Sequence, residues 1–234
     1  MEGSSTNRDA KNYELLAYYY DSLLSDRESF GLWLAYIEEK PFRTVLDLGA
    51  GSAIMAAILA NTGYDVVASD ISRQMKEAAT KNFKGEYLVL DMTDYHLDRK
   101  FDLIICLVDS INYLQEDELD SFFICAKEHL NQNGRLLFDM HHPYRLEEFA
   151  DEYLEEGHID DIDYLWSIES DPYDRLINTH FTFYTPNGMV LENHTQHVFD
   201  CEMIQNKMEK AGFAVRIIDD FVEEEKILVI GEKR

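Results

Sequence analysis

The stretch Thr44-Val45-Leu46-Asp47-Leu48-Gly49-Ala50-Gly51-Ser52-Ala53 decides the fold of this chain. Its apolar run, Thr44–Leu48, is bounded by turn residues and therefore predicts a short buried strand. Gly49 and Gly51 let the backbone turn tightly and approach a ligand closely, because neither has a Cβ. The next segment, Ser52–Thr62, is rich in Ala, Ile, Leu and Met and is followed by a glycine, which predicts a helix. A strand, a glycine turn and a helix in this order indicate a cradle for a nucleotide cofactor.

The residues around the two glycines distinguish between cofactors. A dinucleotide fingerprint needs a small residue three places after Gly51, where helix and strand pack closely, and this chain has Ile54 there. Asp47 would lie close to an anionic diphosphate, whereas it suits a ligand with an ammonium or sulfonium group. The pattern acid-x-Gly-x-Gly resembles the first motif of class I S-adenosylmethionine-dependent methyltransferases, although Ala53 stands where the fullest form of that motif has a third glycine. The alternative is a Gly-x-Gly turn that binds no ligand.

Length and composition limit the classes of function. The chain has 234 residues, 46% of them apolar, which suits one α/β domain with an insertion or two small domains. Its formal net charge of −25 repels nucleic acid and anionic membrane surfaces, so we expect neither as a partner. No stretch approaches ~18 consecutive apolar residues, and the polar N-terminus has no signal-peptide core. The three cysteines are too few and too scattered for a disulfide framework, so we expect a cytoplasmic setting.

The acidic residues are unevenly distributed along the chain. Between Arg145 and Arg175 there are twelve Asp or Glu residues and no Lys or Arg. One interpretation is a solvated surface that keeps the protein in solution. The other is the mouth of a site that attracts a cationic substrate.

The second predicted strand, Tyr64–Ser69, ends at an acid. Asp70 lies 70 − 51 = 19 residues after the second glycine of the cradle. An acid at about this spacing, at the carboxyl end of the second strand, can accept hydrogen bonds from both hydroxyls of a ribose. An Asp after a strand is often a helix N-cap instead, but Ser72 can fill that role here. We therefore favour ribose binding for Asp70.

The family resemblance extends to other positions. The pair Tyr20-Asp21 resembles the Tyr-Asp of small-molecule methyltransferases, in which an N-terminal helix lies over the cofactor. In that family, apolar side chains after the ribose acid flank the adenine, and an acid after the third strand, here predicted at Glu86–Leu90, accepts from the adenine amine. The resemblance implies S-adenosyl-L-methionine as the cofactor. The cofactor-binding residues it implies are Tyr13, Tyr20, Asp47, Gly49, Ala50, Gly51, Asp70, Ile71, Met75, Asp91, Met92 and Leu107.

Three further polar residues follow the fourth and fifth predicted strands, Phe101–Leu107 and Arg135–Asp139. They are Asp109, His141 and His142. Ligands of open α/β sheets bind beyond the carboxyl ends of the strands, so these residues are candidates for a general base, and the histidines also for a polar contact to the substrate. Loop histidines satisfied by the backbone are the alternative. Adjacent histidines point in different directions and no third ligand has a suitable spacing, so we predict no metal site.

The alternation of strands and helices stops after the fifth strand. Leu176–Tyr184 and Met189–Phe199 predict two strands joined by a hairpin turn at Thr185-Pro186-Asn187-Gly188, within an antiparallel sheet of three or so strands. The last two predicted strands, Phe213–Asp219 and Lys226–Gly231, are close enough for an antiparallel pair.

These elements predict an α/β, Rossmann-like fold. The resemblance implies a seven-stranded, mostly parallel sheet in the order 3-2-1-4-5-7-6, with a small antiparallel insertion after strand 5. We expect residues 1–145 and 200–234 to form the cofactor-binding domain. Residues 146–199 would form the insertion, as a substrate cap or as the contact of a homodimer.

The expected activity is methyl transfer to a nitrogen or oxygen of a small molecule, by in-line attack on the sulfonium methyl. An amine or another cationic acceptor would suit the acidic chain. The alternatives are an NAD-dependent oxidoreductase and a non-catalytic regulator that binds S-adenosylmethionine. The fold alone does not name the acceptor.

Overall fold

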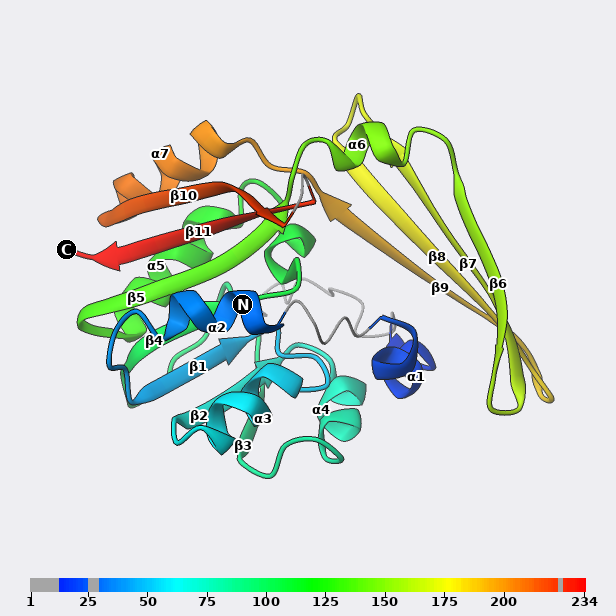
Figure 1. Ribbon diagram of the computed structural model, residues 1–234, viewed down its shortest axis with the longest axis horizontal. Coiled ribbons are helices and arrows are strands. Elements are labelled where there is room, and N and C mark those ends of the chain that lie inside the picture. Colours follow the sequence, from blue (N-terminus) through cyan, green and yellow to red (C-terminus); the bar gives the residue numbers. More distant parts are fainter. Residues whose placement is uncertain (1–12, 25–29, 223–224) are drawn as a thin grey trace, which may run out of the picture.

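The computed structural model describes residues 13–24, 30–222 and 225–234. Within these residues the chain forms a seven-stranded and a four-stranded β-sheet (Figure 1). In order across the larger sheet, the strands are β3 (Glu86–Val89), β2 (Asp65–Asp70), β1 (Thr44–Leu48), β4 (Phe101–Cys106), β5 (Leu130–His141), β11 (Lys226–Lys233) and β10 (Phe213–Val222). The four-stranded sheet, which we call the second sheet, consists of β6 (Tyr153–Ile159), β7 (Ile162–Asp171), β8 (Leu176–Thr185) and β9 (Gly188–His197).

The larger sheet is mostly parallel. Strands β1 to β5 pair in parallel, and β11 pairs antiparallel with both β5 and β10. Numbered along the chain within this sheet, the strands run 3-2-1-4-5-7-6, as predicted. The carboxyl ends of five parallel strands therefore meet at one edge, and the antiparallel β11 begins at that same edge because Lys226 pairs with His141.

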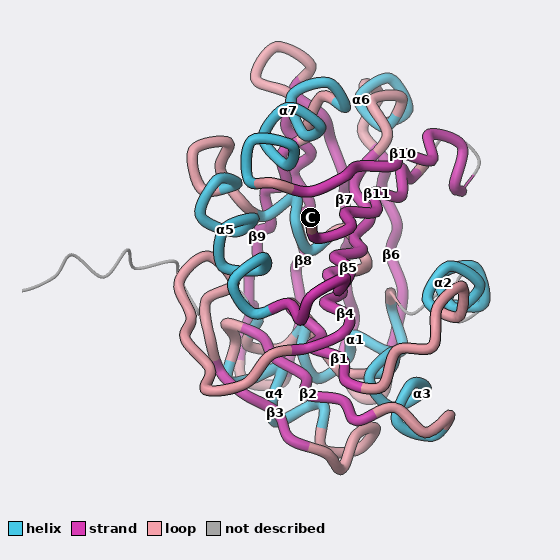
Figure 2. The backbone as a smooth tube through the Cα atoms, turned by 90° about the vertical axis from the view of Figure 1, so that its left-hand side faces the viewer, coloured by secondary structure: helices cyan, strands magenta, loops and turns pink. Residues whose placement is uncertain are grey.

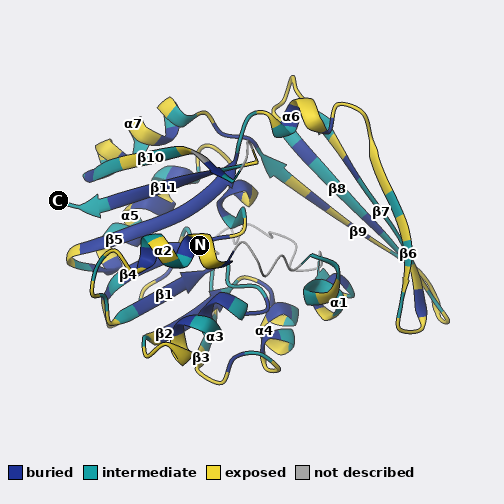
Figure 3. Cartoon of the chain, viewed as in Figure 1, coloured by how far each residue is buried: buried dark blue, intermediate teal, exposed yellow. Residues whose placement is uncertain are grey.

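Helices cover both faces of the larger sheet (Figure 2). Those on one face are α2 (Phe30–Ile37), α3 (Ile54–Asn61) and α4 (Arg73–Ala79), and those on the other are α5 (Leu119–His129) and α7 (Cys201–Ala211). The pleat of β1 explains its apolar run, because Val45 packs toward the first group and Leu46 and Leu48 pack toward the second. Figure 3 shows the central strands buried between these layers. No helix among the described residues is long and apolar enough to cross a bilayer.

The second sheet follows β5 and the short helix α6 (Arg145–Glu148) in the chain. Its strands pair in sequence as antiparallel neighbours. The predicted hairpin is confirmed, with Thr185 paired to Gly188 across the turn. The prediction of three or so strands omitted β6, whose sequence Tyr-Leu-Glu-Glu-Gly-His-Ile is largely polar because β6 is a mostly exposed edge strand.

Helix α1 (Leu16–Leu23) connects the two sheets. At its N-terminal end, Oε1 of Glu192 on β9 accepts hydrogen bonds from the backbone N–H groups of Leu15 and Leu16, at 2.6 and 3.1 Å. A carboxylate at this end of a helix satisfies N–H groups that have no partner inside the helix. Toward its other end, Oδ2 of Asp21 accepts from Asn82 at 2.8 Å. The helix therefore touches both parts of the molecule.

The loop between β1 and α3 has an unusual backbone. Gly49 and Gly51 have φ values of +67° and +52°, and Ala53, at the N-cap of α3, also has a positive φ of 60°. A residue with a Cβ is strained in this left-handed region by roughly 1–2 kcal/mol. The fold therefore keeps the backbone geometry of a third glycine at position 53 although the residue there is alanine.

This strain predicts an unusual response to a glycine substitution. Ala53→Gly should leave the free energy of unfolding unchanged or raise it by up to about 1 kcal/mol, because relief of strain offsets the lost chain entropy. The matched control, Ala57→Gly within α3, should lower it by about 1 kcal/mol. Urea denaturation measures both. An equal loss of stability in the two variants would show that Ala53 is not strained.

Candidate functional site

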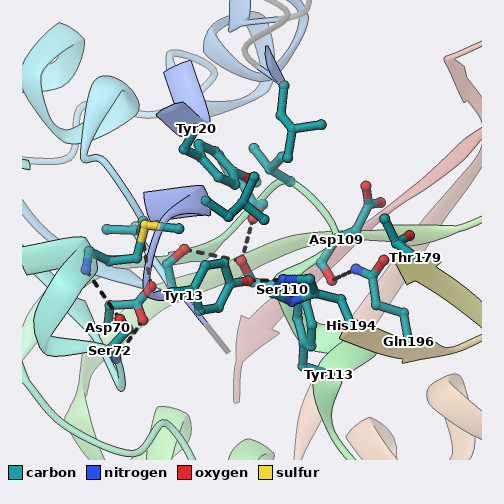
Figure 4. Close-up of a pocket in the computed structure, with 18 of the residues that line it drawn as sticks. Tyr13, Tyr20, Asp70, Ser72, Asp109, Ser110, Tyr113, Thr179, His194 and Gln196 are labelled. Carbon is teal, nitrogen blue, oxygen red and sulfur yellow. Dashed lines mark hydrogen bonds between the residues drawn. The ribbon is translucent and has the colours of Figure 1, made fainter. Parts of the chain in front are cut away.

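A cavity of about 630 Å³ opens at the carboxyl ends of the parallel strands. Its walls come from those strand ends, from α1 and from the inner face of the second sheet, and Figure 4 shows its side chains. All but one of the predicted site residues line it. They are Tyr13, Tyr20, Asp47, Gly49, Ala50, Gly51, Asp70, Ile71, Met75, Asp91, Met92, Leu107, Asp109 and His141.

His142 is the exception, and its prediction as a site residue needs correction. Neighbouring residues at the end of a strand point in opposite directions, so His141 faces the cavity and His142 faces away from it. Nδ1 of His142 accepts from the backbone N–H of Tyr144 at 3.1 Å, and its Nε2 lies 3.8 Å from Asp219. These contacts hold the side chain outside the cavity.

The glycine loop fits closely against the loop that follows β4. A Cβ on Gly49 would lie 2.7 Å from Cβ of Ser110, which no real contact allows. Oγ of Ser110 donates to the carbonyl oxygen of Gly49 at 3.1 Å. On the other side of the loop, the Tyr87 hydroxyl donates to the carbonyl oxygen of Gly51 at 2.7 Å. Glycine is therefore required at position 49 for packing as well as for its positive φ.

Asp70 lies at the end of β2 and binds the glycine loop. Its Oδ2 accepts from the N–H of Gly51 at 3.0 Å, and its Oδ1 accepts from the N–H of Ser72 at 2.8 Å. Burial raises the pKa of Asp70, and these backbone hydrogen bonds oppose the rise. Ser72 is the N-cap of α4, as predicted, because its Oγ accepts from the N–H of Met75. A carboxylate has about four lone pairs, so Asp70 can accept a further hydrogen bond beside those from the backbone of Gly51, Ile71 and Ser72.

Asp47 is a buried carboxyl group without a hydrogen bond on one oxygen. Its side chain is 3% exposed, and its Oδ2 has no partner among the described residues. Burial, and then the charge of Asp70, raises the pKa of Asp47 to about 8. In the absence of a ligand, this group therefore holds a proton at neutral pH, and a cationic group in the cavity would favour its ionised form.

The third strand ends beside the same cavity. Oδ1 of Asp91 accepts from the N–H and the hydroxyl of Thr93, at 2.9 and 2.7 Å. The sulfur of Met92 lies 3.9 Å from Sγ of Cys106 on β4. These contacts hold the segment after β3 close to β4, at the centre of the sheet.

A cluster of buried charges lies where β4, β5 and β11 meet. Nζ of Lys226 lies 2.5 Å from Oδ2 of Asp109 and 3.2 Å from Oδ2 of Asp139. Burial alone would raise the pKa of Asp109, but Lys226 and then His141 lower it. Burial raises the pKa of Asp139 to about 6, against the pull of Lys226. Asp109 is thus held ionised by a lysine that the sequence analysis did not place in the site.

The backbone before this cluster is strained. Val108 and Asp109 both have a φ of 58°, which is rare for residues with a Cβ and most unusual for a β-branched one. Such outliers persist only where the surroundings impose them, and they gather at functional sites. Here Oδ1 of Asp139 accepts from the N–H of Asp109 at 3.3 Å, and Lys226 holds the Asp109 side chain.

The second sheet contributes cavity residues that the sequence analysis missed. They are Trp166, Ile168, Ile177, Thr179, Phe181, Asn193, His194, Thr195 and Gln196. The side chains of Trp166, Phe181 and His194 share one face, because residues two apart on a strand point the same way and Trp166 pairs with Phe181. The alternation of side chains along these strands was visible in the sequence, but the sequence did not indicate which face of the second sheet turns toward the glycine loop.

A chain of aromatic polar groups crosses the cavity from the segment before α1 to β9. The Tyr13 hydroxyl donates to that of Tyr113 at 3.1 Å, and the Tyr113 hydroxyl lies 3.5 Å from Nδ1 of His194 (Figure 4). Burial lowers the pKa of His194 to about 4, so its ring is neutral at physiological pH. Nε2 of His194 and Nε1 of Trp166 have no hydrogen-bond partner among the described residues.

The acidic segment between Arg145 and Arg175 does not form the cavity wall. None of its twelve acids lines the cavity, whereas Arg145 itself does. The acids that face the cavity come from the strand ends and from Glu225. This agrees with the interpretation of the segment as a solvated surface.

Comparison with known proteins connects this site to a family. Residues 45–134 match the family model described as a methyltransferase domain. Over 246 residues, the chain is 26% identical to the Geobacillus sp. (strain WCH70) protein named "Putative methyltransferase GWCH70_2453", covering 94% of this chain and 99% of that protein.

Solved structures share the fold. The sugar N-methyltransferase KedS8 from Streptoalloteichus sp. ATCC 53650 superposes with a TM-score of 0.81 at 20% identity, covering 100% of this chain and 98% of that one. The amino pentose methyltransferase CalS10 from Micromonospora echinaspora, solved with bound S-adenosylmethionine, gives 0.73 at 16% identity, with coverage of 93% and 95%. The segment that matches the family model runs from β1 into the beginning of β5 and includes the glycine loop and the acidic ends of β1, β2 and β3. The chain therefore contains a methyltransferase domain at residues 45–134 and shares the fold of solved S-adenosylmethionine-dependent methyltransferases.

Proposed function

We propose that this enzyme transfers the methyl group of S-adenosylmethionine to a nitrogen or oxygen of a small molecule that binds against the second sheet. One observation carries the proposal. A single cavity has the glycine loop and acidic strand ends on one side and the uncharged wall of the second sheet on the other. The first side suits a nucleoside with a cationic tail, and the second suits an uncharged or weakly polar acceptor.

The cofactor side fits S-adenosylmethionine in two respects. At Gly51 the glycine loop leaves its backbone open, because a Cβ there would meet only the sulfur of Met75, at 4.0 Å, so a ligand can approach it closely. The unpaired carboxyl oxygen of Asp47 lacks a partner that an ammonium or sulfonium group would supply. We assign Asp70 to the ribose hydroxyls, Asp91 to the adenine amine, and Tyr20 to the methionine carboxylate.

The remaining assignments complete the cofactor side. Gly49, Ala50 and Gly51 would contact the cofactor through their backbone. Ile71 and Met75 would flank the adenine, and the N–H of Met92 would meet a ring nitrogen. Tyr13 and Leu107 would close the two ends of the site. The support for these roles is that all these residues line the same cavity.

The protein's main task is to orient the two reactants. When bound, S-adenosylmethionine supplies a methyl group on a sulfonium sulfur that already activates it. Good positioning can lower a barrier by roughly 7–11 kcal/mol, so little further catalysis is required. A base is needed where the acceptor arrives protonated, and Asp109 and His141 are the candidates that face the cavity.

The names of the similar structures, which include a sugar N-methyltransferase and an amino pentose methyltransferase, support an amine acceptor. We further propose that residues 146–199 act as a substrate cap on a cofactor domain made of residues 1–145 and 200–234. Support comes from β7, β8 and β9, which line the cavity. A homodimer through the Leu176–Phe199 hairpin and a cytoplasmic setting are further proposals, and light scattering tests the first.

A substrate panel tests the proposed activity. The purified enzyme should release S-adenosylhomocysteine from S-adenosylmethionine with at least one class among amines, amino sugars and phenols. Thermal-shift assays in parallel should show stabilisation by S-adenosylhomocysteine and none by NAD or NADH, because a ligand stabilises the state that binds it. Binding without turnover on any acceptor class would favour a regulator instead.

The ribose assignment predicts a loss of affinity in Asp70→Ala. Each hydrogen bond to a carboxylate contributes roughly 1.5–3 kcal/mol, so the variant should bind S-adenosylhomocysteine about tenfold more weakly or worse. Asp65→Ala, at the exposed beginning of the same strand, is the matched control and should bind as the wild type does. Isothermal titration calorimetry measures both, and unchanged affinity in Asp70→Ala would remove the ribose assignment.

The raised pKa of Asp47 predicts a specific dependence of stability on pH. In the folded protein the carboxyl group of Asp47 keeps its proton up to about pH 8, whereas in the unfolded chain it loses the proton near pH 3.8. The free energy of unfolding of the wild type therefore falls as the pH rises between these values. Asp47→Asn removes this loss. Without ligand, its unfolding midpoint should exceed that of the wild type by a margin that grows from pH 5 to pH 8.

The exposed Asp98 provides the control for this experiment. Asp98→Asn should follow the wild type at every pH, as measured by differential scanning calorimetry. A margin between Asp47→Asn and the wild type that stays constant with pH would mean that Asp47 is ionised in the folded protein throughout.

A further inference from the structure

Three cavity residues from different elements meet beside the Lys226 cluster. His141 ends β5, Asp109 follows β4, and Gln196 comes from β9 of the second sheet. Nε2 of Gln196 donates to the backbone carbonyl oxygen of Asp109 at 3.2 Å, and its Oε1 lies 3.2 Å from Nε2 of His141. Figure 4 shows Gln196 directed from β9 toward Asp109.

The partners of Gln196 determine how its amide is oriented. The carbonyl oxygen of Asp109 can only accept a hydrogen bond, so the amide nitrogen of Gln196 must face it. The amide oxygen therefore faces Nε2 of His141, and because this oxygen also only accepts, Nε2 must carry a hydrogen. A neutral imidazole has a single N–H, so Nδ1 of His141 is left with a free lone pair.

That lone pair faces a second acceptor. Nδ1 of His141 lies 3.6 Å from Oδ1 of Asp109, and this oxygen has no hydrogen-bond partner among the described residues. The other oxygen of Asp109 is bound to Lys226. Two buried acceptors at this separation, both lining the cavity, form a place that can receive one proton.

The charges around His141 agree with a neutral ring that can take up a proton. Burial lowers its pKa, Asp109 raises it, and the cations Lys226 and Arg145 lower it. Asp139 shares Lys226 with Asp109 and also accepts a hydrogen bond from the N–H of Asp109.

The backbone of His141 is also tied to β9. Its N–H donates to Oδ1 of Asn112 at 3.2 Å, and the amide nitrogen of Asn112 donates to the carbonyl oxygen of His197 at 2.6 Å. Gln196 and His197 therefore hold the same stretch of β9 against the end of β5. The second sheet is thereby connected to the candidate base by two neighbouring residues.

We propose that Gln196 is a positioning residue that keeps His141 in the Nε2–H tautomer, so that Nδ1, beside Oδ1 of Asp109, takes the proton that the methyl acceptor loses. This inference rests on the proposed function. The acceptor atom bonds to the methyl carbon while the carbon–sulfur bond breaks and leaves its electron pair on sulfur. The proton of the acceptor passes to Nδ1, which becomes part of an imidazolium beside the Asp109 carboxylate.

Nitrogen NMR of the full-length, ¹⁵N-labelled protein without ligands tests the tautomer directly. The His141 signals are assigned by their absence from His141→Asn. In the wild type, above the pKa of His141, Nδ1 should have the chemical shift of an unprotonated nitrogen and Nε2 that of a protonated one. The opposite assignment in the wild type would overturn the proposal without any need for a Gln196 variant.

Two variants of Gln196 separate positioning from a merely structural role. Gln196→Leu removes the acceptor, so His141 should move to the Nδ1–H form, donating to Asp109. Gln196→Glu keeps an acceptor at Nε2, so it should retain the wild-type tautomer and raise the pH at which His141 titrates. Gln205→Leu, on the exposed side of α7, is the control and should leave the His141 signals unchanged. An unchanged tautomer in folded Gln196→Leu would refute the role of Gln196.

Kinetics on the amine acceptor that the substrate panel identifies test the proton transfer. Gln196→Leu should lower kcat about tenfold or more, with KM for S-adenosylmethionine nearly unchanged, because general-base catalysis contributes factors of 10²–10⁴. Gln196→Glu should recover most of this loss and move the acidic limb of the pH profile upward. Identical pH profiles in all three proteins would contradict the proposal.

The two hypotheses can fail separately. The NMR measurement needs neither cofactor nor acceptor, so a wrong tautomer leaves the proposed methyl transfer intact. No turnover on any acceptor, with the predicted tautomer observed, counts against the proposed function alone.

Discussion

The close approach of two loops at the carboxyl edge of the larger sheet is the constraint on which the site depends. Gly49, after β1, has no room for a Cβ beside Ser110, and the Ser110 hydroxyl bonds the carbonyl of the same glycine. This contact fixes the cofactor cradle against the segment that carries Asp109. Because parallel strands end at one edge, the acids at the carboxyl ends of β1, β2 and β3 join the same cavity.

Buried charge gives this cavity two different sides. Near the glycine loop, Oδ2 of Asp47 has no hydrogen-bond partner among the described residues, and the raised pKa of this group keeps it protonated at neutral pH. Near β5, Lys226 forms ion pairs with Asp109 and Asp139. The carboxylate of Asp109 therefore stays ionised although it is buried. Burial of an unpaired charge is costly, which explains why the lysine bridges two acids. The second sheet adds no charged side chain to the cavity wall.

The sequence predicts the strand-end residues well, because strand periodicity and glycine chemistry are local properties. Lys226 was missed although the antiparallel pairing of the last strand was predicted, and this pairing places the first residue of that strand at the carboxyl edge. Gln196 and His194 could not be found, because the sequence does not say where a β-insertion folds back or which face it presents. The adjacent His141 and His142 looked equivalent, and only the direction of the strand end separates them.

The central claim is that the acidic, glycine-bearing strand ends hold the nucleoside and direct its sulfur toward the Asp109 side of the cavity. A crystal structure of the enzyme with S-adenosylhomocysteine tests it most directly. We expect the ribose hydroxyls within hydrogen-bonding distance of Asp70, the amino group beside Asp47, and the sulfur facing the second sheet. A nucleoside bound elsewhere, or bound here with its ribose away from Asp70, would contradict it.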